Sequence, residues 1–281
     1  MQSPGSSPDP PWVGGGMSER AWCQLCPNPS PMTLDGTNTW ILTEPGSTAS
    51  IVIDPGPLDE DHLSSVLTHV QSIGSRVALT LLTHRHDDHA QSAGRFRDLT
   101  GAPVRAIGRG HDDLGEGDRV TVAGLEVWVV STPGHTDDSV SFVLPAEQTL
   151  LTGDTILGRG STVVAHPDGR LSAYLESLER LRQLTASGQV TRLAPGHGPA
   201  VFDAEATVTG YIEHRARRLD QVREAVDRHR DTMANGEHTD DLADAVVRTV
   251  YADVSRDLWP AARLSVLAQL EYLGQVSGRD E

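Results

Sequence analysis

The chain has 281 residues and a formal net charge of −16 at pH 7, and all 23 of its lysine-plus-arginine positions hold arginine. This length accommodates one large domain and a small appended one. The absence of lysine excludes Schiff-base and phosphate-loop lysine chemistry, and the acidic charge opposes binding of nucleic acid except through a local basic patch or a metal.

The first segment, residues 1–16, is rich in proline, glycine and serine and is too poor in apolar residues to order itself. We expect a disordered tract there, with translation starting at Met1 or Met17. No apolar run approaches the roughly 20 residues that cross a bilayer, and no basic region followed by an apolar stretch opens the chain. We therefore expect a cytoplasmic protein that makes no membrane contact.

Cys23 and Cys26 form a lone C-x-x-C motif. A zinc ribbon would need a second pair of cysteines. A redox-active C-x-x-C motif is normally followed by a helix, and the prolines after Cys26 oppose a helix there. We expect two small residues in an N-terminal strand.

Residues 17–204 are predicted to form one α/β domain. Runs of strand length, each bounded by Gly, Pro or Asp, lie at 39–43, 50–56, 76–83, 104–107, 125–132, 139–144, 149–153 and 191–195. Helical spacing of apolar residues precedes Gly74 and Gly101, and a further helix is expected behind Ser172 as N-cap.

Residues 205–281 show only helical spacing, and we predict a small helical module there. Ile212, Leu219, Val222 and Val226 form one apolar stripe, and a polar break at 231–240 separates it from two further helices that end at Gly274. Residues 211–281 carry 10 arginines against 14 acidic residues, a net charge of −4.

The stretch LLTHRHDDHA, residues 81–90, packs metal-binding side chains directly behind an apolar run. In a tight loop His84 and His86 face one side, while Asp88 and His89 come from the turn that follows. One tetrahedral ion would be filled by these four ligands and would keep no position for water. Their density therefore favours two adjacent metal ions.

Three further candidate ligands follow later strands at Gly or Pro turns. His135 lies in STPGHTDD, Asp154 in LLTGDT and His197 in LAPGHGP. Strand ends that meet at one edge of a sheet bring such residues together. We assign His84, His86 and His135 to a first ion, Asp88, His89 and His197 to a second, and Asp154 as the bridge between them.

Over about residues 32–200 the chain resembles the metallo-β-lactamase-fold hydrolase superfamily. The resemblance is carried by the motifs THRHDDHA, TPGHT, TGD and APGHG. The resemblance implies a four-layer αββα sandwich with two zinc ions at one edge. It also implies hydrolysis by a metal-bridging hydroxide, which two zinc ions make available at neutral pH. Asp88 and Asp154 are the expected catalytic residues. Many true β-lactamases carry cysteine at the second-metal site, so Asp154 favours hydrolysis of an ester, thioester or phosphodiester over that of antibiotics.

A narrower resemblance, to the β-lactamase-like protein 2 group, covers almost the whole chain. It is carried by the segments NPSPMTLDGTNTW, GDTILGRGSTVV, YLESLERL, APGHGPAV and YIEHRARRLDQV. This implies a C-terminal winged-helix-like module and a substrate that is either single-stranded RNA or a small ester or thioester. Only seven residues follow Gly274, which leaves little room for a wing. Because the module is also acidic, we expect it to shape the substrate cleft and not to bind duplex DNA.

Two alternatives remain open. A glyoxalase-II-like hydroxyacylglutathione thioesterase would use HRARR, residues 214–218, for the glutathione carboxylates. A non-enzymatic winged-helix regulator with a sensing metal is opposed by the open site, because structural zinc sites are closed. For a ribonuclease, Arg215, Arg217 and Arg218 are the candidate phosphate contacts. Substrate, physiological metal and oligomeric state are not determined by the sequence.

Four more residues have candidate supporting roles outside the metal set. Asn38 is expected to hold the Asp35–Gly36 turn. Asp54 ends a strand and is a candidate hydrogen-bond partner of a ligand histidine. Tyr174 and His166 are either cleft residues or ordinary core and surface residues.

Overall fold

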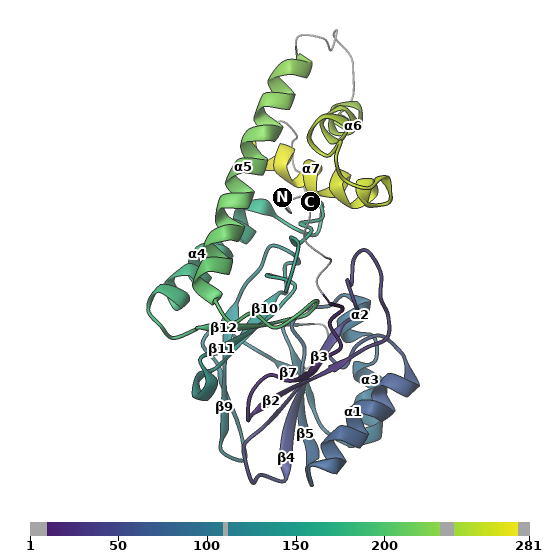
Figure 1. Cartoon of the computed structure of the whole chain (residues 1–281), viewed down its shortest axis with the longest axis vertical. Helices are drawn as coiled ribbons and strands as arrows, with labels where there is room; N and C mark the ends of the chain where they lie inside the picture. Colours follow the sequence, from purple (N-terminus) through teal and green to yellow (C-terminus); the bar gives the residue numbers. More distant parts are fainter. Residues whose placement is uncertain (1–9, 109–111, 231–238, 275–281) are drawn as a thin grey trace.

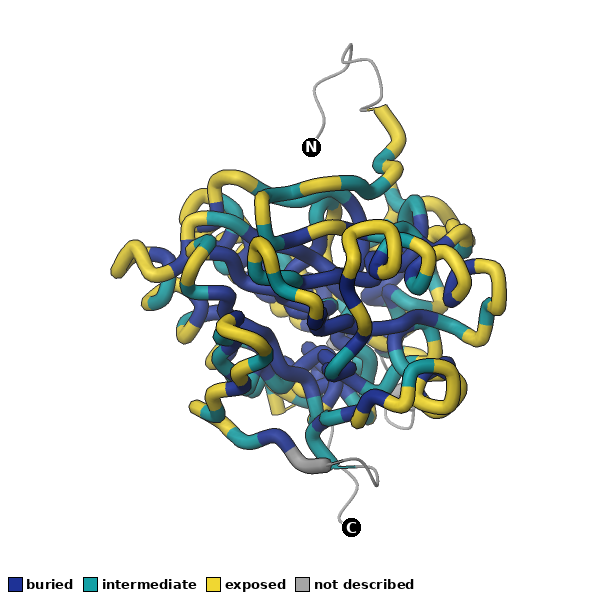
Figure 2. The backbone as a smooth tube through the Cα atoms, turned by 90° about the horizontal axis from the view of Figure 1, so that it is seen from below, coloured by how far each residue is buried: buried dark blue, intermediate teal, exposed yellow. Residues whose placement is uncertain are grey.

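The computed structural model describes residues 10–108, 112–230 and 239–274. Two β-sheets lie face to face, with helices on both outer sides and a helical module beyond one of them (Figure 1). This arrangement confirms the predicted αββα sandwich with an appended helical module. Buried backbone runs through the centre of the molecule, and exposed segments surround it (Figure 2).

The first sheet has seven strands in chain order. They are β1 (Gly15–Gly16), β2 (Ala21–Leu25), β3 (Asn38–Thr43), β4 (Ala49–Ile53), β5 (Arg76–Leu81), β6 (Val104–Ala106) and β7 (Asp112–Asp113). Pairing is antiparallel from β1 to β4 and parallel from β4 to β7. The outer face is covered by α1 (Glu60–Ser72) and α3 (Ala93–Thr100), with the short α2 (Asp87–Ala90) between them in sequence.

The second sheet has five strands in the order β12-β11-β10-β9-β8. They are β8 (Arg119–Val122), β9 (Leu125–Ser131), β10 (Val140–Leu144), β11 (Thr149–Gly153) and β12 (Arg192–Pro195). Only β11 and β12 pair in parallel, across the connection that contains α4 (Leu171–Ala186). Short 3₁₀ turns lie at Pro145–Glu147 and Arg256–Leu258.

Apolar side chains of both sheets form the central core. Leu42 and Leu81 of the first sheet belong to the same buried cluster as Phe142 and Leu151 of the second. Separate clusters join the first sheet to α1 and α3, and the second sheet to α4. Strands buried on both faces read as continuous apolar runs, which is why β4, β5 and β11 were predictable.

The C-terminal module consists of α5 (Ala204–Arg230), α6 (Thr239–Val250) and α7 (Trp259–Tyr272). α5 leaves the sandwich beside α4 and continues to the module, where its Val222 and Val226 pack with Val246 and Leu270 (Figure 1). Within the described part of residues 204–274 there is no strand. None of the helices that can be described has the length and apolar character needed to traverse a membrane.

Two local expectations are wrong. The segment up to residue 16 is not disordered throughout: residues 15 and 16 form β1, which pairs with β2, and Trp12 packs against the central core. The composition of the segment did not reveal these contacts, which come from one aromatic side chain and from the edge of a strand. Residues 1–9 of the expected disordered tract lie outside the described residues. Ser172 lies inside α4, which begins at Leu171 without a side-chain cap.

Candidate metal centre

The seven predicted ligands come together at one edge of the sandwich, from four segments that follow strands. His84 to His89 follow β5, His135 follows β9, Asp154 follows β11 and His197 follows β12. All seven belong to three overlapping groups in which the ligand atoms lie within 4.8 Å of one another. The convergence arises because these strands, in two facing sheets, end at the same edge.

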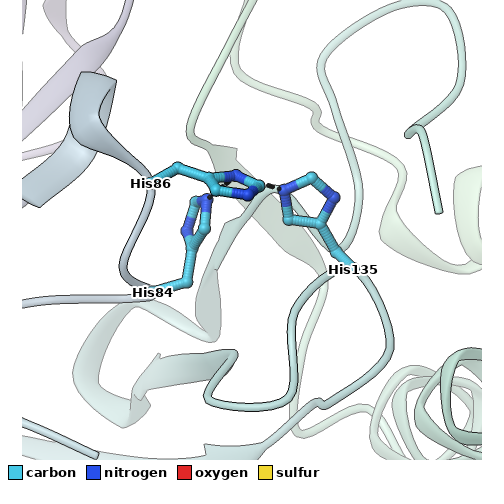
Figure 3. A group of neighbouring side chains, drawn as sticks. All are labelled: His84, His86 and His135. Carbon is cyan, nitrogen blue, oxygen red and sulfur yellow. Dashed lines mark hydrogen bonds between the residues drawn. The ribbon is translucent and has the colours of Figure 1, made fainter. Parts of the chain in front are cut away.

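The first group contains three imidazoles that face a common point (Figure 3). His86 Nδ1 lies 3.1 Å from His84 Nε2 and 3.0 Å from His135 Nε2. Three ring nitrogens at these separations form one face of a coordination sphere suited to zinc and similar ions.

The second group contains His89, His197 and Asp88. The Nε2 atoms of the two rings are 3.2 Å apart, and Asp88 Oδ2 lies 3.2 Å from His197 Nε2 and 3.6 Å from His89 Nε2. Asp88 is the most exposed of the three, so the group opens to solvent on its side.

Asp154 lies between the two groups. Its Oδ1 is 3.4 Å from His89 Nε2, and its Oδ2 is 3.3 Å from His197 Nε2 and 3.7 Å from His135 Nε2. Oδ1 is buried and has no hydrogen-bond partner. A buried carboxylate oxygen without a partner is costly unless a cation binds it.

Hydrogen bonds at the far side of the rings orient four of the imidazoles. The Nδ1 of His135 donates to Val163 O (2.7 Å), and that of His197 donates to Gly36 O (3.1 Å). The Nδ1 of His89 donates to Asp54 Oδ2 (2.9 Å). His84 Nδ1 lies 3.0 Å from Thr83 Oγ1. Since Nδ1 holds the proton, each Nε2 presents its lone pair to the centre, as a metal ligand requires.

Asp54 has a strained backbone, and its carboxylate holds the orientation of the His89 ring. Its backbone has a φ of 52°, in the left-handed region, and its carboxylate accepts from Thr83 N at 2.7 Å, Thr83 Oγ1 at 2.6 Å and His89 Nδ1 at 2.9 Å. The predicted supporting role of Asp54 is therefore visible in the structure.

Electrostatics divide the rings into two classes. Burial holds the pKa of His84 well below its usual range and lowers that of His86 to about 4, so these rings stay neutral. Burial also lowers the pKa of His197, but the carboxylates of Asp154 and Asp88 outweigh it and raise that pKa to about 9. The second group thus favours positive charge, which a divalent cation supplies in place of protons.

The backbone leaves room for ions at this point. A Cβ on Gly196 would lie 2.6 Å from Asp154 Oδ1 and 2.7 Å from His89 Cε1, so any side chain there would fill the centre. Free space, converging lone pairs and the unpartnered Asp154 oxygen together fit bound metal. Gly196, Thr83 and Val163 were not singled out from the sequence, although Gly196 stands within APGHG.

A cleft of about 340 Å³ opens onto this centre between the sandwich and the helical module. His135 and Asp154 lie at one side of it. Its other walls are largely apolar and include Met32, Leu34, Leu157, Val163, Tyr251, Val254, Leu258, Ala261 and Ala262. The module therefore forms part of the cleft, as predicted.

Asn38 lies differently from expectation, whereas Tyr174 and His166 lie outside the cleft, which was one of the two positions left open for them. Asn38 does not hold its own turn: its Nδ2 donates to Pro195 O (2.9 Å) and Gly198 O (2.8 Å) and so fixes the segment of His197. Tyr174 is fully buried and donates to Thr155 O, and His166 lies 3.9 Å from Glu271, outside the cleft lining.

The three arginines of HRARR separate. Arg215 and Arg218 line the cleft, whereas Arg217 is exposed and pairs with Glu213 on its own helix. Arg217 therefore lies outside the cleft that Arg215 and Arg218 line, because residues two apart on a helix point to different sides.

Comparison with known proteins agrees with this geometry. The sequence model of the metallo-β-lactamase superfamily matches residues 108–197, and that of the β-lactamase-associated winged helix domain matches residues 243–275. A β-lactamase-like protein 2 homolog from Caenorhabditis elegans is 33% identical over 259 residues, covering 88% of this chain and 80% of its own. An atrochrysone carboxyl ACP thioesterase from Aspergillus fumigatus is 32% identical over 290 residues, covering 98% of this chain and 88% of its own.

Solved structures share the fold of this chain. The crystal structure of a metallo-β-lactamase family protein from Thermus thermophilus superimposes with a TM-score of 0.73 at 21% identity, covering 92% of this chain and 95% of that one. The chain is therefore a hydrolase that belongs to the metallo-β-lactamase superfamily and, within it, to the β-lactamase-like protein 2 group.

Proposed function

We propose that the protein is a dinuclear zinc hydrolase that cleaves a small ester or thioester. His84, His86 and His135 would hold one ion, and Asp88, His89 and His197 the other, with Asp154 between them. The neutral imidazoles and the two carboxylates form a ligand set that zinc favours. When bound, two such ions would supply an activated water at neutral pH and would polarise the oxygen of the bond under attack.

The chain's own residues supply orientation and charge. The hydrogen bonds to Val163, Gly36, Asp54 and Thr83 keep each Nε2 aimed at the centre, which fixes where a substrate oxygen is met. The pKa of Asp88 is raised by burial, but His89 and His197 lower it to about 2. Asp88 is then ionised at neutral pH, and its carboxylate would orient the water that attacks the substrate.

The cleft supports the choice of substrate class, and this observation carries the proposal. Its apolar walls lead directly to His135 and Asp154, and its size matches the lower range of small-molecule sites. A single-stranded RNA would instead need a basic groove, since phosphate contacts dominate such binding, and the chain has a net charge of −16. The thioesterase name of the Aspergillus fumigatus relative is consistent with this class.

The glutathione thioester of the glyoxalase-II-like alternative remains a second candidate, because Arg215 and Arg218 do line the cleft. It differs from the main proposal in needing the glutathione carboxylates for binding. S-lactoylglutathione in the substrate panel separates the two.

Metal analysis and a substrate panel test the proposal. We expect about two equivalents of zinc per chain, and thioester hydrolysis that a chelator abolishes and zinc restores. The panel contains acyl thioesters of N-acetylcysteamine, S-lactoylglutathione and a labelled single-stranded RNA. One tightly held ion that added zinc does not change would contradict the dinuclear assignment, and cleavage of RNA alone would contradict the substrate class.

A further inference from the structure

Arg215 on α5 is a buried cation without an anionic partner. Its side chain is 6% exposed, and its Nε is buried and makes no hydrogen bond. Its Nη2 donates to the backbone oxygen of Thr162, and its guanidinium lies 4.8 Å from the centre of the Tyr174 ring. Among the described residues no carboxylate lies within ion-pair distance of it.

Neighbouring arginines on the same helix show the usual arrangement. Arg217 lies 3.5 Å from Glu213, and Arg223 lies 2.7 Å from Asp220, both at the surface. In the cleft wall Arg159 lies 2.5 Å from Asp35. Burying a charge is costly when no opposite charge accompanies it, so the surroundings of Arg215 are those of a residue that receives its anion from a ligand.

The position of Arg215 connects it to the metal centre. It lines the same cleft as His135 and Asp154. Thr162 joins the two, because its backbone oxygen accepts from Arg215 while its hydroxyl donates to the backbone oxygen of Asp154 at 2.6 Å. A small molecule in the cleft therefore reaches both the guanidinium and the centre.

Burial indicates which part of a substrate would meet Arg215. The leaving thiol or alcohol, with any carrier attached to it, must remain at the mouth of the cleft, whereas Arg215 is almost completely covered. The cleft that contains both the guanidinium and the centre is also lined by apolar side chains such as Leu157 and Val163, which suit a carbon skeleton.

We propose that Arg215 binds a carboxylate on the acyl part of the substrate, so that the enzyme selects acyl groups that end in an anion. This inference rests on the proposed ester or thioester hydrolysis at the same site. Guanidinium and carboxylate pair through two parallel hydrogen bonds, and Arg215 retains donors for them after its bond to Thr162.

Matched thioesters test the selection. Succinyl, glutaryl and adipyl thioesters of N-acetylcysteamine are compared with the butanoyl, pentanoyl and hexanoyl thioesters of equal length. For the best-fitting length we expect kcat/KM to be about 10- to 100-fold higher with the carboxylate, as for a charged hydrogen bond. Arg215→Gln should bring this ratio close to one, whereas the matched control Arg217→Gln on the same helix should keep it.

Coenzyme A thioesters test the other source of an anion. If the wild-type enzyme preferred a coenzyme A thioester over its N-acetylcysteamine counterpart and Arg215→Gln abolished that preference, the guanidinium would serve the leaving group and our inference would be wrong. If Arg215→Gln fails to fold, the wild-type comparison decides: equal kcat/KM for charged and neutral acyl groups at every length overturns the proposal.

A binding measurement separates this inference from the proposed function. Calorimetric titration of the wild-type protein with glutarate and with pentanoate needs no turnover. Tighter binding of glutarate by about 10-fold or more, lost in Arg215→Gln, supports the anion site even if no thioester is cleaved. Equal affinity for the two acids, with neither affinity changed by Arg215→Gln, contradicts the anion site even if thioesters are cleaved.

Discussion

Asp154 places one negative charge against two groups of imidazoles. Burial raises the pKa of its carboxyl, but His197 and His89 outweigh burial and hold that pKa well below its usual range. The side chain is thus ionised although it is almost completely enclosed, with one oxygen unpartnered. Its charge, and not merely its shape, is what the centre uses.

Asp154→Asn should reduce kcat/KM by more than about 100-fold and lower the bound zinc, because the amide retains the shape but loses the charge that joins the two groups. Activity, metal content and thermal unfolding are measured together. Asp61→Asn, an exposed change on α1, is the control. If Asp154→Asn lost cooperative unfolding, its role would be structural.

His62 on α1 illustrates a buried histidine that is not a ligand. Its Nε2 lies 2.8 Å from Thr39 Oγ1, its Nδ1 has no partner, and burial lowers its pKa to about 4. An unfolded histidine has a pKa near 6.5, so between these values the unfolded state binds the proton and the folded state does not. Stability contributed by neutral His62 is therefore lost as the pH falls below about 6.5.

We expect His62→Gln to reduce the loss of unfolding free energy between pH 7 and pH 5 by about 2 kcal/mol relative to the wild-type protein. Chemical denaturation at both pH values gives the difference. His69→Gln, at a half-buried position of the same helix, should change it less. An unchanged pH dependence in His62→Gln would show that His62 is protonated in the folded state.

The cluster of candidate ligands was predictable because each residue stands directly after a strand in a short turn motif. Asn38 was misassigned because its partners, Pro195 and Gly198, lie about 160 residues away and no local pattern reveals them. The burial of Arg215 did leave a signal: it stands four residues after Tyr211 and four before Leu219, on the buried stripe of α5. Arg215 was grouped with Arg217 as a candidate phosphate contact because only their charge was considered.

At the scale of elements, α4 packs directly on the turn that carries His135. Gly134 has a φ of 134°, and a Cβ there would lie 2.3 Å from the Tyr174 Cα. Gly134 O accepts from Arg170 N at 3.0 Å at the start of the helix. The helix and the turn thus fix each other's position.

Gly134→Ala should destabilise the protein by at least about 1–3 kcal/mol, since it combines backbone strain with a collision against α4. It should also lower zinc affinity, because the displaced turn carries His135. Thermal unfolding and metal titration measure the two effects. Gly210→Ala, in the open interior of α5, is the control and should stabilise by about 0.5–1 kcal/mol. Equal melting of Gly134→Ala and the wild-type protein would refute the tight contact.

Elements differ in how much of their structure local sequence encodes. The eight apolar runs all became strands, because their residues are either buried on both faces, as in β4 and β11, or alternate between buried and half-buried, as in β9. β8 was missed because its alternation of polar and apolar residues extends over only four positions, of which Val120 alone is buried. The start of α4 was misplaced because Arg170 N bonds to Gly134 O, a tertiary contact that sets the helix entry in place of a serine cap.

At the scale of the whole molecule, the charge is acidic in the module as well as in the sandwich. A duplex-binding surface gains affinity by releasing counterions, which needs clustered unpaired cations. On α5 the exposed Arg217, Arg223 and Arg228 each lie beside an acidic residue of the same helix. The winged-helix match thus describes ancestry of the module and does not by itself imply DNA binding.

We expect no measurable binding of the full chain to duplex DNA from about 50 to about 200 mM salt. Fluorescence anisotropy of a labelled duplex, titrated with protein at both ends of this range, provides the measurement. A protein of known DNA affinity controls for the integrity of the duplex. Tight binding that falls steeply with salt would revive the regulator alternative.

The metal centre draws its side chains from both sheets, beginning at His84 after β5 and ending at His197 after β12. During synthesis, a nascent chain that has emerged only as far as α4 already contains the first group in full, but the second group still lacks an imidazole. We therefore expect the second ion to bind only after β12 has been synthesised and the two sheets have closed on each other.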